Sequence, residues 1–396
     1  MKILFITSRF PYPPLKGDKI RAYYPIRDLS ARHEIDLVAF SEEKIADQDL
    51  AEMRKYCRKI KPVEVSERAW KVKAYLGLFT SWPSYVYCYH TPKMTDIITE
   101  MVSENSYDLV YFVCGRLAYY RELVKGIPTA MDWIDSFSLS TERRYKSERN
   151  PVKKAAYFLE WKKMIAFESH YPKLFDATFI TSGVDKEYLK NENLAVVPNG
   201  VDVSLFHAGT VKKDIDIIFT GNMGYDPNEK AVEFFCEKVL PGIKQYCPEI
   251  KFYICGTTPS DRVLKYHDDH NVIVTGFVED MAKILNRSKV FVAPMVSGAG
   301  IQNKILEAMA CGLPVVSTRF GNAGIKAMDG EQIIIRDNSQ DMASEIVDLI
   351  RNSDRMHEIG LKAKEMVEKD FSWELSVKKI ESALLSCIAA RQAQNK

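Results

Sequence analysis

Short apolar runs alternate with longer helical patterns along almost the whole chain, and this alternation constrains the fold more than any other feature. A first series of β-branched and aromatic runs covers 2–7, 35–40, 107–113, 129–134, 177–182 and 195–199. A second series covers 216–221, 251–256, 272–277, 290–294, 314–318 and 332–336. Segments with a helical period, such as 229–246 and 303–312, lie between these runs. The pattern predicts an α/β protein whose parallel sheets are covered by helices on both faces.

The second series begins after HAGTVKKD (207–214), a polar stretch without periodicity. A chain of 396 residues is also longer than one hydrophobic core usually serves. We therefore predict two doubly wound, Rossmann-like domains, 1–205 and 206–374. The amphipathic segment 375–396 is expected to form a helix that packs back on the first domain.

Composition argues against several classes of protein. The net charge is +2, so the chain as a whole does not favour binding to a polyanion. Eight cysteines are scattered without a CxxC pair, which is typical of reduced thiols in a cytosolic protein. No stretch approaches the roughly 20 apolar residues that span a bilayer, and MKILFIT is too short for the core of a signal peptide. We expect a cytoplasmic protein.

The segment VFVAPMVSGAGIQNKILEAMACGLPVVST (290–318) has the pattern of a strand, a glycine-containing loop, a helix and a second strand. Gly298 and Gly300 would let the backbone approach a ligand closely. The start of the helix offers free backbone amides to a diphosphate. These amides would belong to Ile301, Gln302 and Asn303. Lys304 would add a cation, and the carboxylate of Glu307, one turn later, can accept hydrogen bonds from two ribose hydroxyls.

The same loop partly matches the dinucleotide-binding fingerprint, which would indicate a nicotinamide-dependent dehydrogenase. Its first two glycines match, but Asn303 stands where the third is required. The acidic residue expected about 20 residues further on is also missing. The chain has Thr-Arg-Phe-Gly (318–321) there. The dehydrogenase is therefore a weaker alternative.

GIQNKILEAMACGLPVVST (300–318) resembles the donor-binding segment of retaining glycosyltransferase family 4. PNGVDVSLF (198–206), IIFTGNMGYDPNEKAVEFF (217–235) and TGFVED (275–280) fit the same family pattern in the same order. SRFPYPPLKGDKIRAYY (8–24) is similar to a branch of bacterial exopolysaccharide sugar transferases. The resemblance covers nearly the whole chain. It implies the GT-B fold, in which two Rossmann-like domains face a central cleft.

The resemblance also implies roles for residues of the second domain. Glu307 would bind the ribose of a nucleotide-sugar donor, and 301–304 would line its diphosphate. Gly276 to Val278 would cradle the nucleobase, while Gly221 and Asn222 would lie under the diphosphate.

Two departures from the family pattern affect this assignment. Ala299 replaces the first glutamate of the paired motif, so the identity of the transferred sugar cannot be carried over. The usual Arg and Lys after the first strand of the second domain are also missing: Asn222 stands near the first, and Lys230 is the candidate substitute for the second. The diphosphate charge would then be neutralised by Lys304 or by Arg9.

The first domain carries the candidate acceptor residues. The loop RFPYPPLKGDKIR (9–21) is basic, and the resemblance implies that it closes over donor diphosphate and acceptor. Gly17 is accordingly expected at the donor, and three basic residues at the acceptor, namely Arg9, Lys16 and Arg21. Asp132 ends a strand, where it could position or deprotonate an acceptor hydroxyl. The second carboxylate of this segment, Asp135, could serve as the N-cap of the segment that follows and not contact an acceptor.

RRYKSERNPVKKAAYFLEWKKM (143–164) combines eight Lys and Arg residues with two Glu and several aromatic residues. Such a basic, aromatic helix suits the surface of an anionic membrane, where lipid-linked acceptors reside. A solvated face opposite a core face is the alternative. No nucleic-acid motif accompanies the run.

Together these features predict a hexosyltransferase that moves a sugar from a nucleoside-diphosphate sugar to a glycan or lipid-linked hydroxyl, with retention. Asp132, Lys304 and Glu307 are its candidate catalytic residues. We expect no metal and no other cofactor, because the chain has no HExxH and no DxD pair in a suitable loop. A dehydrogenase, a non-catalytic sugar-nucleotide-binding subunit and a sugar-nucleotide epimerase remain as alternatives.

Overall fold

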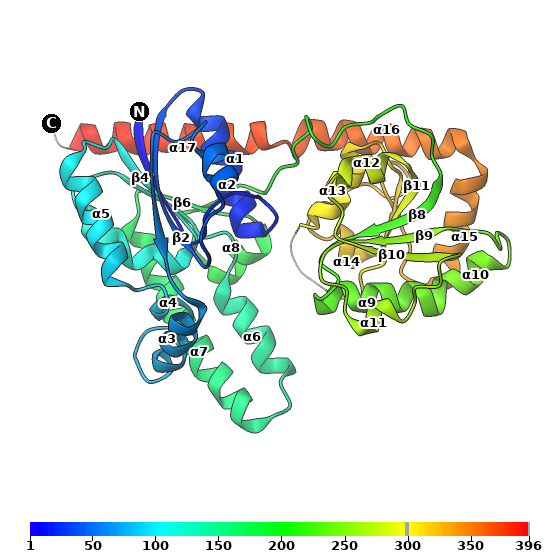
Figure 1. Cartoon of the computed structure of the whole chain (residues 1–396), viewed down its shortest axis with the longest axis horizontal. Coiled ribbons are helices and arrows are strands. Elements are labelled where there is room, and N and C mark those ends of the chain that lie inside the picture. The colour runs from blue at the N-terminus through cyan, green and yellow to red at the C-terminus, as the bar shows by residue number, and fades with distance from the viewer. Residues whose placement is uncertain (298–300, 395–396) are drawn as a thin grey trace. The chain divides into compact units, whose positions relative to one another are not determined.

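The computed structural model describes residues 1–297 and 301–394, which form two compact units (Figure 1). The first unit contains residues 1–198 together with the C-terminal segment from 376, and the second contains 199–375. The domain boundary expected after residue 205 therefore lies inside the second unit. Residues 199–205 belong there because Val201 pairs with Ser372, and its backbone N–H donates to the carbonyl of Phe371 at 2.7 Å.

The first unit is built on a parallel sheet with the strand order β3-β2-β1-β4-β5-β6-β7. Its strands are β1 (Lys2–Thr7), β2 (Glu34–Ser41), β3 (Lys59–Glu64), β4 (Leu109–Val113), β5 (Thr129–Asp132), β6 (Ala177–Ile180) and β7 (Leu194–Val196). Successive side chains of β1 point to opposite faces of the sheet. Leu4 and Ile6 enter one core cluster, while Ile3 and Phe5 are buried on the other face.

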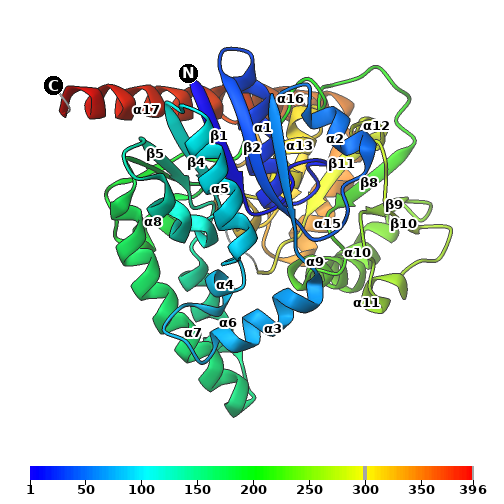
Figure 2. The same cartoon turned by 60° about the vertical axis from the view of Figure 1, so that its left-hand side comes forward.

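The first unit also contains helices on the faces and at one end of this sheet. They are α1 (Gly17–Ser30), α2 (Asp47–Met53), α3 (Glu67–Gly77), α4 (Ser84–Tyr87), α5 (Pro92–Glu104), the 3₁₀ segment η1 (Gly115–Val124), α6 (Phe137–Ser147), α7 (Pro151–His170), the 3₁₀ segment η2 (Tyr171–Leu174), α8 (Gly183–Leu189) and α17 (Trp373–Gln394). The C-terminal helix α17 is tied to the first unit by Glu381, whose carboxylate accepts hydrogen bonds from Arg32 at 2.9 and 2.7 Å. Figures 1 and 2 both show α3, α4, α6 and α7 gathered at one end of this unit.

Strand β3 is absent from the sequence prediction. Its sequence, KIKPVE, contains Pro62 and two lysines, and only Val63 is fully buried. Proline cannot donate to a neighbouring strand, so it is found mainly in edge strands. The structure places β3 at the edge of the sheet, paired only with β2 among the described strands. A half-exposed edge strand does not have the apolar run that identified the other strands.

The basic run 143–164 forms parts of two helices rather than one. Helix α6 ends at Ser147, and α7 begins at Pro151 after the cap Asn150, whose side chain accepts hydrogen bonds from the backbone of Val152 and Lys153. An asparagine cap followed by proline is a strong start signal for a helix. The expected continuous helix was therefore wrong, and we call the pair α6–α7 the basic hairpin.

The second unit is built on a parallel sheet with the order β10-β9-β8-β11-β12-β13. The strands are β8 (Ile215–Thr220), β9 (Phe252–Cys255), β10 (Val272–Gly276), β11 (Ser288–Ala293), β12 (Val315–Ser317) and β13 (Ile334–Ile335). The helices are α9 (Asp226–Phe234), the π-helical segment η3 (Phe235–Val239), α10 (Leu240–Lys244), α11 (Asp261–Leu264), α12 (Met281–Asn286), α13 (Asn303–Ala310), α14 (Arg319–Asn322), α15 (Ser339–Arg351) and α16 (Ser353–Asp370). Buried side chains of these strands and helices form one continuous core.

In each sheet the strand order reverses at one pair of neighbours. These pairs are β1 and β4 in the first unit, and β8 and β11 in the second. Doubly wound α/β folds bind ligands outside the carboxyl ends of the strands at such switch points. The loops after β1, β4, β8 and β11 are therefore the places to look for functional residues.

Within the described residues, no helix combines the length and the apolar character needed to cross a membrane.

Candidate functional site

The loop after β8 contains Gly221 and Asn222, and three segments of the second unit meet there. The backbone of Gly221 has a φ of +153°, which side chains rarely permit. A Cβ at this position would lie 2.7 Å from Nδ2 of Asn228 and 3.4 Å from Nζ of Lys304. Glycine is therefore required for α9 and α13 to bring their side chains to this loop.

Asn228 connects the loop to Lys304. It lies in the first turn of α9, is 4% exposed, and donates a 2.8 Å hydrogen bond from Nδ2 to the carbonyl oxygen of Asn222. Its Oδ1 accepts a hydrogen bond from Nζ of Lys304. Our sequence reasoning missed Asn228, although it stands in the segment that carries the family resemblance. The signal was weak, because an asparagine in a first helical turn usually faces solvent.

Lys304 is the second residue of α13. Its ammonium lies 4.8 Å from the centroid of the Phe219 ring and 4.0 Å from the sulfur of Met295. Burial lowers the pKa of Lys304 to about 8, although Glu307 acts in the opposite direction. Among the described residues, no carboxylate lies within ion-pair distance of this ammonium. The site therefore holds a partly desolvated cation fixed by a neutral amide, an arrangement that favours an incoming anion.

Glu307 lies one turn after Lys304 on the same side of α13. Its side chain is half-buried, and no described residue donates a hydrogen bond to its carboxylate or pairs with it. Burial raises the pKa of Glu307 to about 7, with Lys304 opposing the shift. No described residue occupies the acceptor positions of this carboxylate, which suits it to accept hydrogen bonds from ligand hydroxyls.

Glu168 of the first unit is also a buried carboxylate, but unlike Glu307 it accepts several hydrogen bonds from the protein. Its oxygens accept hydrogen bonds from the hydroxyl of Ser136, and from the backbone N–H and hydroxyl of Ser138. The backbone N–H of Phe137 donates a further bond at 2.7 Å. Glu168 therefore holds the start of α6 in place, whereas no hydrogen bond from the described part of the chain gives Glu307 such a structural role.

The remaining expected donor residues of this unit follow the strand ends. Gly298 and Gly300 lie outside the described residues. Ile301 and Gln302 directly precede α13 and are half-buried, and Asn303 opens the helix. Gly276, at the end of β10, has a φ of +69°, and its carbonyl accepts a 2.9 Å hydrogen bond from the backbone of Gly256. Val278 packs against the core two residues later.

The candidate residues of the loop after β1 belong to the first unit. Arg9 is 26% exposed and forms ion pairs with Asp18 at 2.9 Å and Glu42 at 3.0 Å. Lys16 and Gly17 are exposed at the start of α1. A contact of these residues with donor or acceptor remains a prediction.

Arg21 and Asp132 do not lie as the acceptor role requires. Both side chains are fully buried, and Nε of Arg21 lies 2.7 Å from Oδ2 of Asp132. The carboxylate also accepts hydrogen bonds from the hydroxyl of Tyr111 at 3.2 Å and the backbone of Ile134 at 3.1 Å. Neither side chain reaches solvent, so the expected contact with an acceptor hydroxyl is corrected to a structural ion pair. The cap considered for Asp135 is supplied by Ser136.

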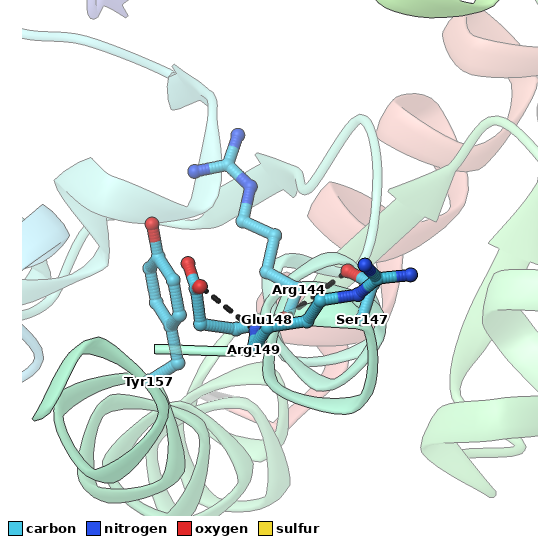
Figure 3. A pocket seen from close by; sticks show the side chains of 5 residues that line it. All are labelled: Arg144, Ser147, Glu148, Arg149 and Tyr157. Atoms are coloured by element: carbon cyan, nitrogen blue, oxygen red, sulfur yellow. Dashed lines mark hydrogen bonds between the residues drawn. The ribbon is translucent and has the colours of Figure 1, made fainter. Parts of the chain in front are cut away.

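A hollow of about 450 Å³ lies where the two helices of the basic hairpin meet. Figure 3 shows the side chains that line it, from the end of α6, the connection and α7. They are Arg144, Ser147, Glu148, Arg149 and Tyr157. Glu148 caps its own connection by accepting hydrogen bonds from the backbone of Arg149 and Asn150, each at 2.9 Å.

The chain is similar in sequence to known glycosyltransferases. Residues 214–352 match the family model described as glycosyl transferases group 1. An uncharacterized 44.6 kDa protein in the cps region of Klebsiella pneumoniae is 23% identical over 389 residues, 93% of this chain and 96% of the relative. A UDP-Gal:alpha-D-GlcNAc-diphosphoundecaprenol alpha-1,3-galactosyltransferase of Escherichia coli is 26% identical over 285 residues, 64% of this chain and 68% of the relative.

The fold comparison covers the whole molecule. The crystal structure of Anabaena Alr3699/HepE in complex with UDP matches with a TM-score of 0.67 and 14% identity, over 98% of this chain and 100% of the other. At this level of identity the likeness concerns the fold alone. It confirms the predicted α/β architecture of the GT-B class, with two Rossmann-like domains.

Proposed function

Residues 214–352 are a glycosyl transferases group 1 domain, and from this premise we propose that the chain transfers a hexose from a UDP-sugar to a hydroxyl of a lipid-linked polysaccharide precursor, with retention. The observation that carries the proposal is the meeting of Gly221, Asn228 and Lys304 at the switch point of the second sheet, on the same helix side as Glu307, whose carboxylate has no partner among the described residues. The names of the relative that uses UDP-Gal and of the structural neighbour solved with UDP support the choice of uridine.

Each group has a distinct part in this proposal. The backbone around Gly221 and the amides at the start of α13 bind the diphosphate. Lys304 stabilises the negative charge that develops on the departing diphosphate, so that no metal is needed. Glu307 accepts hydrogen bonds from the ribose hydroxyls, and the backbone of 276–278 contacts the base.

UDP should raise the apparent melting temperature of the purified protein, and NAD should leave it unchanged. A ligand that binds only the folded state and is present at 100 times its Kd adds about 2.7 kcal/mol of stability, which corresponds to a shift of several degrees. The measurement is a thermal-shift assay with UDP, GDP and NAD, repeated in EDTA. Stabilisation by NAD alone would indicate a dehydrogenase, and UDP binding without sugar transfer would indicate a non-catalytic subunit.

The proposal includes the cytoplasmic face of a membrane as the place of action. The basic hairpin and the neighbouring α3 combine exposed apolar side chains with basic ones. The exposed apolar residues of α3 and the segment after it are Val72, Tyr75, Leu76, Leu78 and Phe79, and those of α7 are Val152, Phe158, Leu159 and Ile165. Lys163 of α7 joins the two elements by donating to the carbonyls of Gly77 and Leu78 at 3.1 and 3.0 Å. Apolar groups surrounded by basic ones suit an anionic lipid surface.

The double variant Arg144→Glu/Arg149→Glu should bind vesicles of anionic lipid at least tenfold more weakly than the unchanged protein. Each basic residue near such a surface contributes about 1 kcal/mol, and reversing the charge adds repulsion. Co-sedimentation with vesicles that contain or lack phosphatidylglycerol measures the effect. Lys362→Glu, an exposed charge change on α16 of the second unit, is the control. If the double variant bound anionic vesicles as tightly as the Lys362→Glu control, the membrane contact would be contradicted.

A further inference from the structure

The switch point of the first sheet carries a buried cation that the proposed function does not use. Strand β4 ends at Val113, and Arg116 follows directly in η1, beside the end of β1 in the strand order. The side chain of Arg116 is 7% exposed. It therefore lies where a doubly wound sheet binds its ligand.

The surroundings of Arg116 are aromatic. The centre of its guanidinium lies 4.1 Å from the ring centroid of Tyr85, 4.6 Å from that of Tyr89 and 5.7 Å from that of Phe137. Nε donates to the sulfur of Cys114 at 3.1 Å, and one terminal nitrogen donates to the hydroxyl of Tyr89. These contacts use two of the five N–H groups of a guanidinium.

No carboxylate within the described part of the chain forms an ion pair with Arg116. The other deeply buried arginine of this unit, Arg21, is paired with Asp132 at 2.7 Å. Burial lowers the pKa of Arg116 to about 9, although Asp18 and Glu42 act against the shift, so the group stays charged at neutral pH. A buried charge without a counter-ion is costly, and an incoming anion removes that cost.

The backbone around Arg116 is strained. Cys114, after β4, has a φ of +88°, and Ile134, after the neighbouring β5, has a φ of +67°. A positive φ is unfavourable at a β-branched residue such as Ile134, and residues in such conformations cluster at ligand sites. A Cβ at Gly115 would lie 2.3 Å from the Trp133 ring, so the glycine lets η1 pack on that ring and sets the position of Arg116.

We propose that Arg116, together with Arg9, binds a phosphate group of the acceptor at the carboxyl edge of the first sheet. The inference rests on the proposed function, because it takes the acceptor to be a phosphate-bearing lipid-linked sugar. A planar guanidinium with free N–H groups matches the oxygen pairs of a phosphate. Arg9 acts on Arg116 electrostatically and is itself partly exposed. It is paired with Asp18 at 2.9 Å and Glu42 at 3.0 Å, so it must exchange one of these carboxylates for the phosphate.

The test compares two ligands that share a diphosphate. Geranyl diphosphate stands for the lipid-linked acceptor and UDP for the donor, and isothermal titration gives their Kd values. We expect Arg116→Met to raise the Kd of geranyl diphosphate by about tenfold to a hundredfold and to change that of UDP less than twofold. Lys304→Met should have the opposite selectivity. If UDP fails to bind the unchanged protein, the donor proposal fails while the geranyl diphosphate arm still tests Arg116.

Arg121→Met is the matched control, because Arg121 lies on the same η1 and donates to the carbonyl of Leu174 at 2.9 Å. It should leave both Kd values unchanged. If Arg116→Met does not fold, Arg9→Gln tests the site from its exposed side, with an expected rise of about threefold to tenfold for geranyl diphosphate. An unchanged Kd in the folded variant overturns the proposal. So does an equal loss of UDP binding, or binding of inorganic phosphate as tight as that of geranyl diphosphate.

Discussion

Replacing Glu307 by alanine is expected to weaken the binding of UDP and UDP-sugars by a factor of about a hundred or more. Hydrogen bonds to a charged group contribute about 1.5–3 kcal/mol each, and the proposal assigns two of them to this carboxylate. No described residue pairs with the Glu307 carboxylate, so its removal should be seen in binding and not in folding. Isothermal titration with UDP measures the change.

The fold should tolerate this substitution. Burial raises the pKa of Glu307 from 4.5 to about 7, so the folded state holds its proton more tightly than the unfolded chain. In that case stability falls as the pH rises from about 4.5 to 7, and the ionised carboxylate disfavours the folded state at pH 8. Glu307→Ala should therefore not lower the melting temperature at pH 8. Glu331→Ala, an exposed carboxylate of the same unit, is the control. Unchanged UDP affinity in folded Glu307→Ala would refute the ribose role.

Replacing Lys304 by methionine is expected to lower kcat by a factor of about a hundred to a thousand. Removing one preorganised group that stabilises charge in a transition state typically costs this much. Methionine keeps the length of the side chain and suits its contacts with Phe219 and Met295. Steady-state kinetics with the UDP-sugar measures the loss.

Two comparisons make the Lys304 result specific. Lys230→Met removes the lysine that the sequence left as a substitute, but that lysine is exposed and paired with Asp226 at 2.7 Å. It should keep near-normal kcat. The affinity for UDP should also fall above pH 8 in the unchanged protein, because Lys304 has a lowered pKa of about 8 and loses its charge there. Lys304→Met should lack this alkaline fall. A normal kcat in Lys304→Met, or an unchanged alkaline limb, would contradict the role.

On the acid side of the same pH profile, we expect the affinity for UDP to depend on the ionisation of Glu307. The ionised carboxylate is a stronger acceptor for the ribose hydroxyls than the protonated acid, so the affinity for UDP should rise as the pH passes through about 7. UDP itself also titrates near pH 6, and a Glu307→Gln variant separates the two effects because it removes only the part due to the protein.

Local patterns in the sequence were enough for the α/β class and for the positions of most strands. Apolar runs and helical periods are properties of neighbouring residues, and they do not depend on what the segment later packs against. Strand β3 escaped because its Pro62 and lysines suit an edge strand, which needs no continuous apolar run. The break in the basic hairpin is encoded locally by Asn150-Pro151, a cap followed by proline, whereas the charge pattern runs on through both helices.

The GT-B fold and the expected donor residues came from the family resemblance, and the structure brings several of those residues together. Gly221, Asn222 and Lys304 meet around Asn228, which no spacing in the sequence singles out. The meeting depends on the strand order of the second sheet, since parallel strands bring their carboxyl ends to one edge.

Burial and pairing were beyond the reach of the sequence. Asp132 ends a strand just as a reactive carboxylate would, yet it is paired with Arg21, which lies 111 positions away. Arg116 stands in a similar place and has no such partner within the described residues. Whether a charged side chain is neutralised inside the protein or stays open to a ligand depends on residues distant in the chain. A local pattern carries no information about those neighbours, and for that reason the two arginines could be told apart only in the folded molecule.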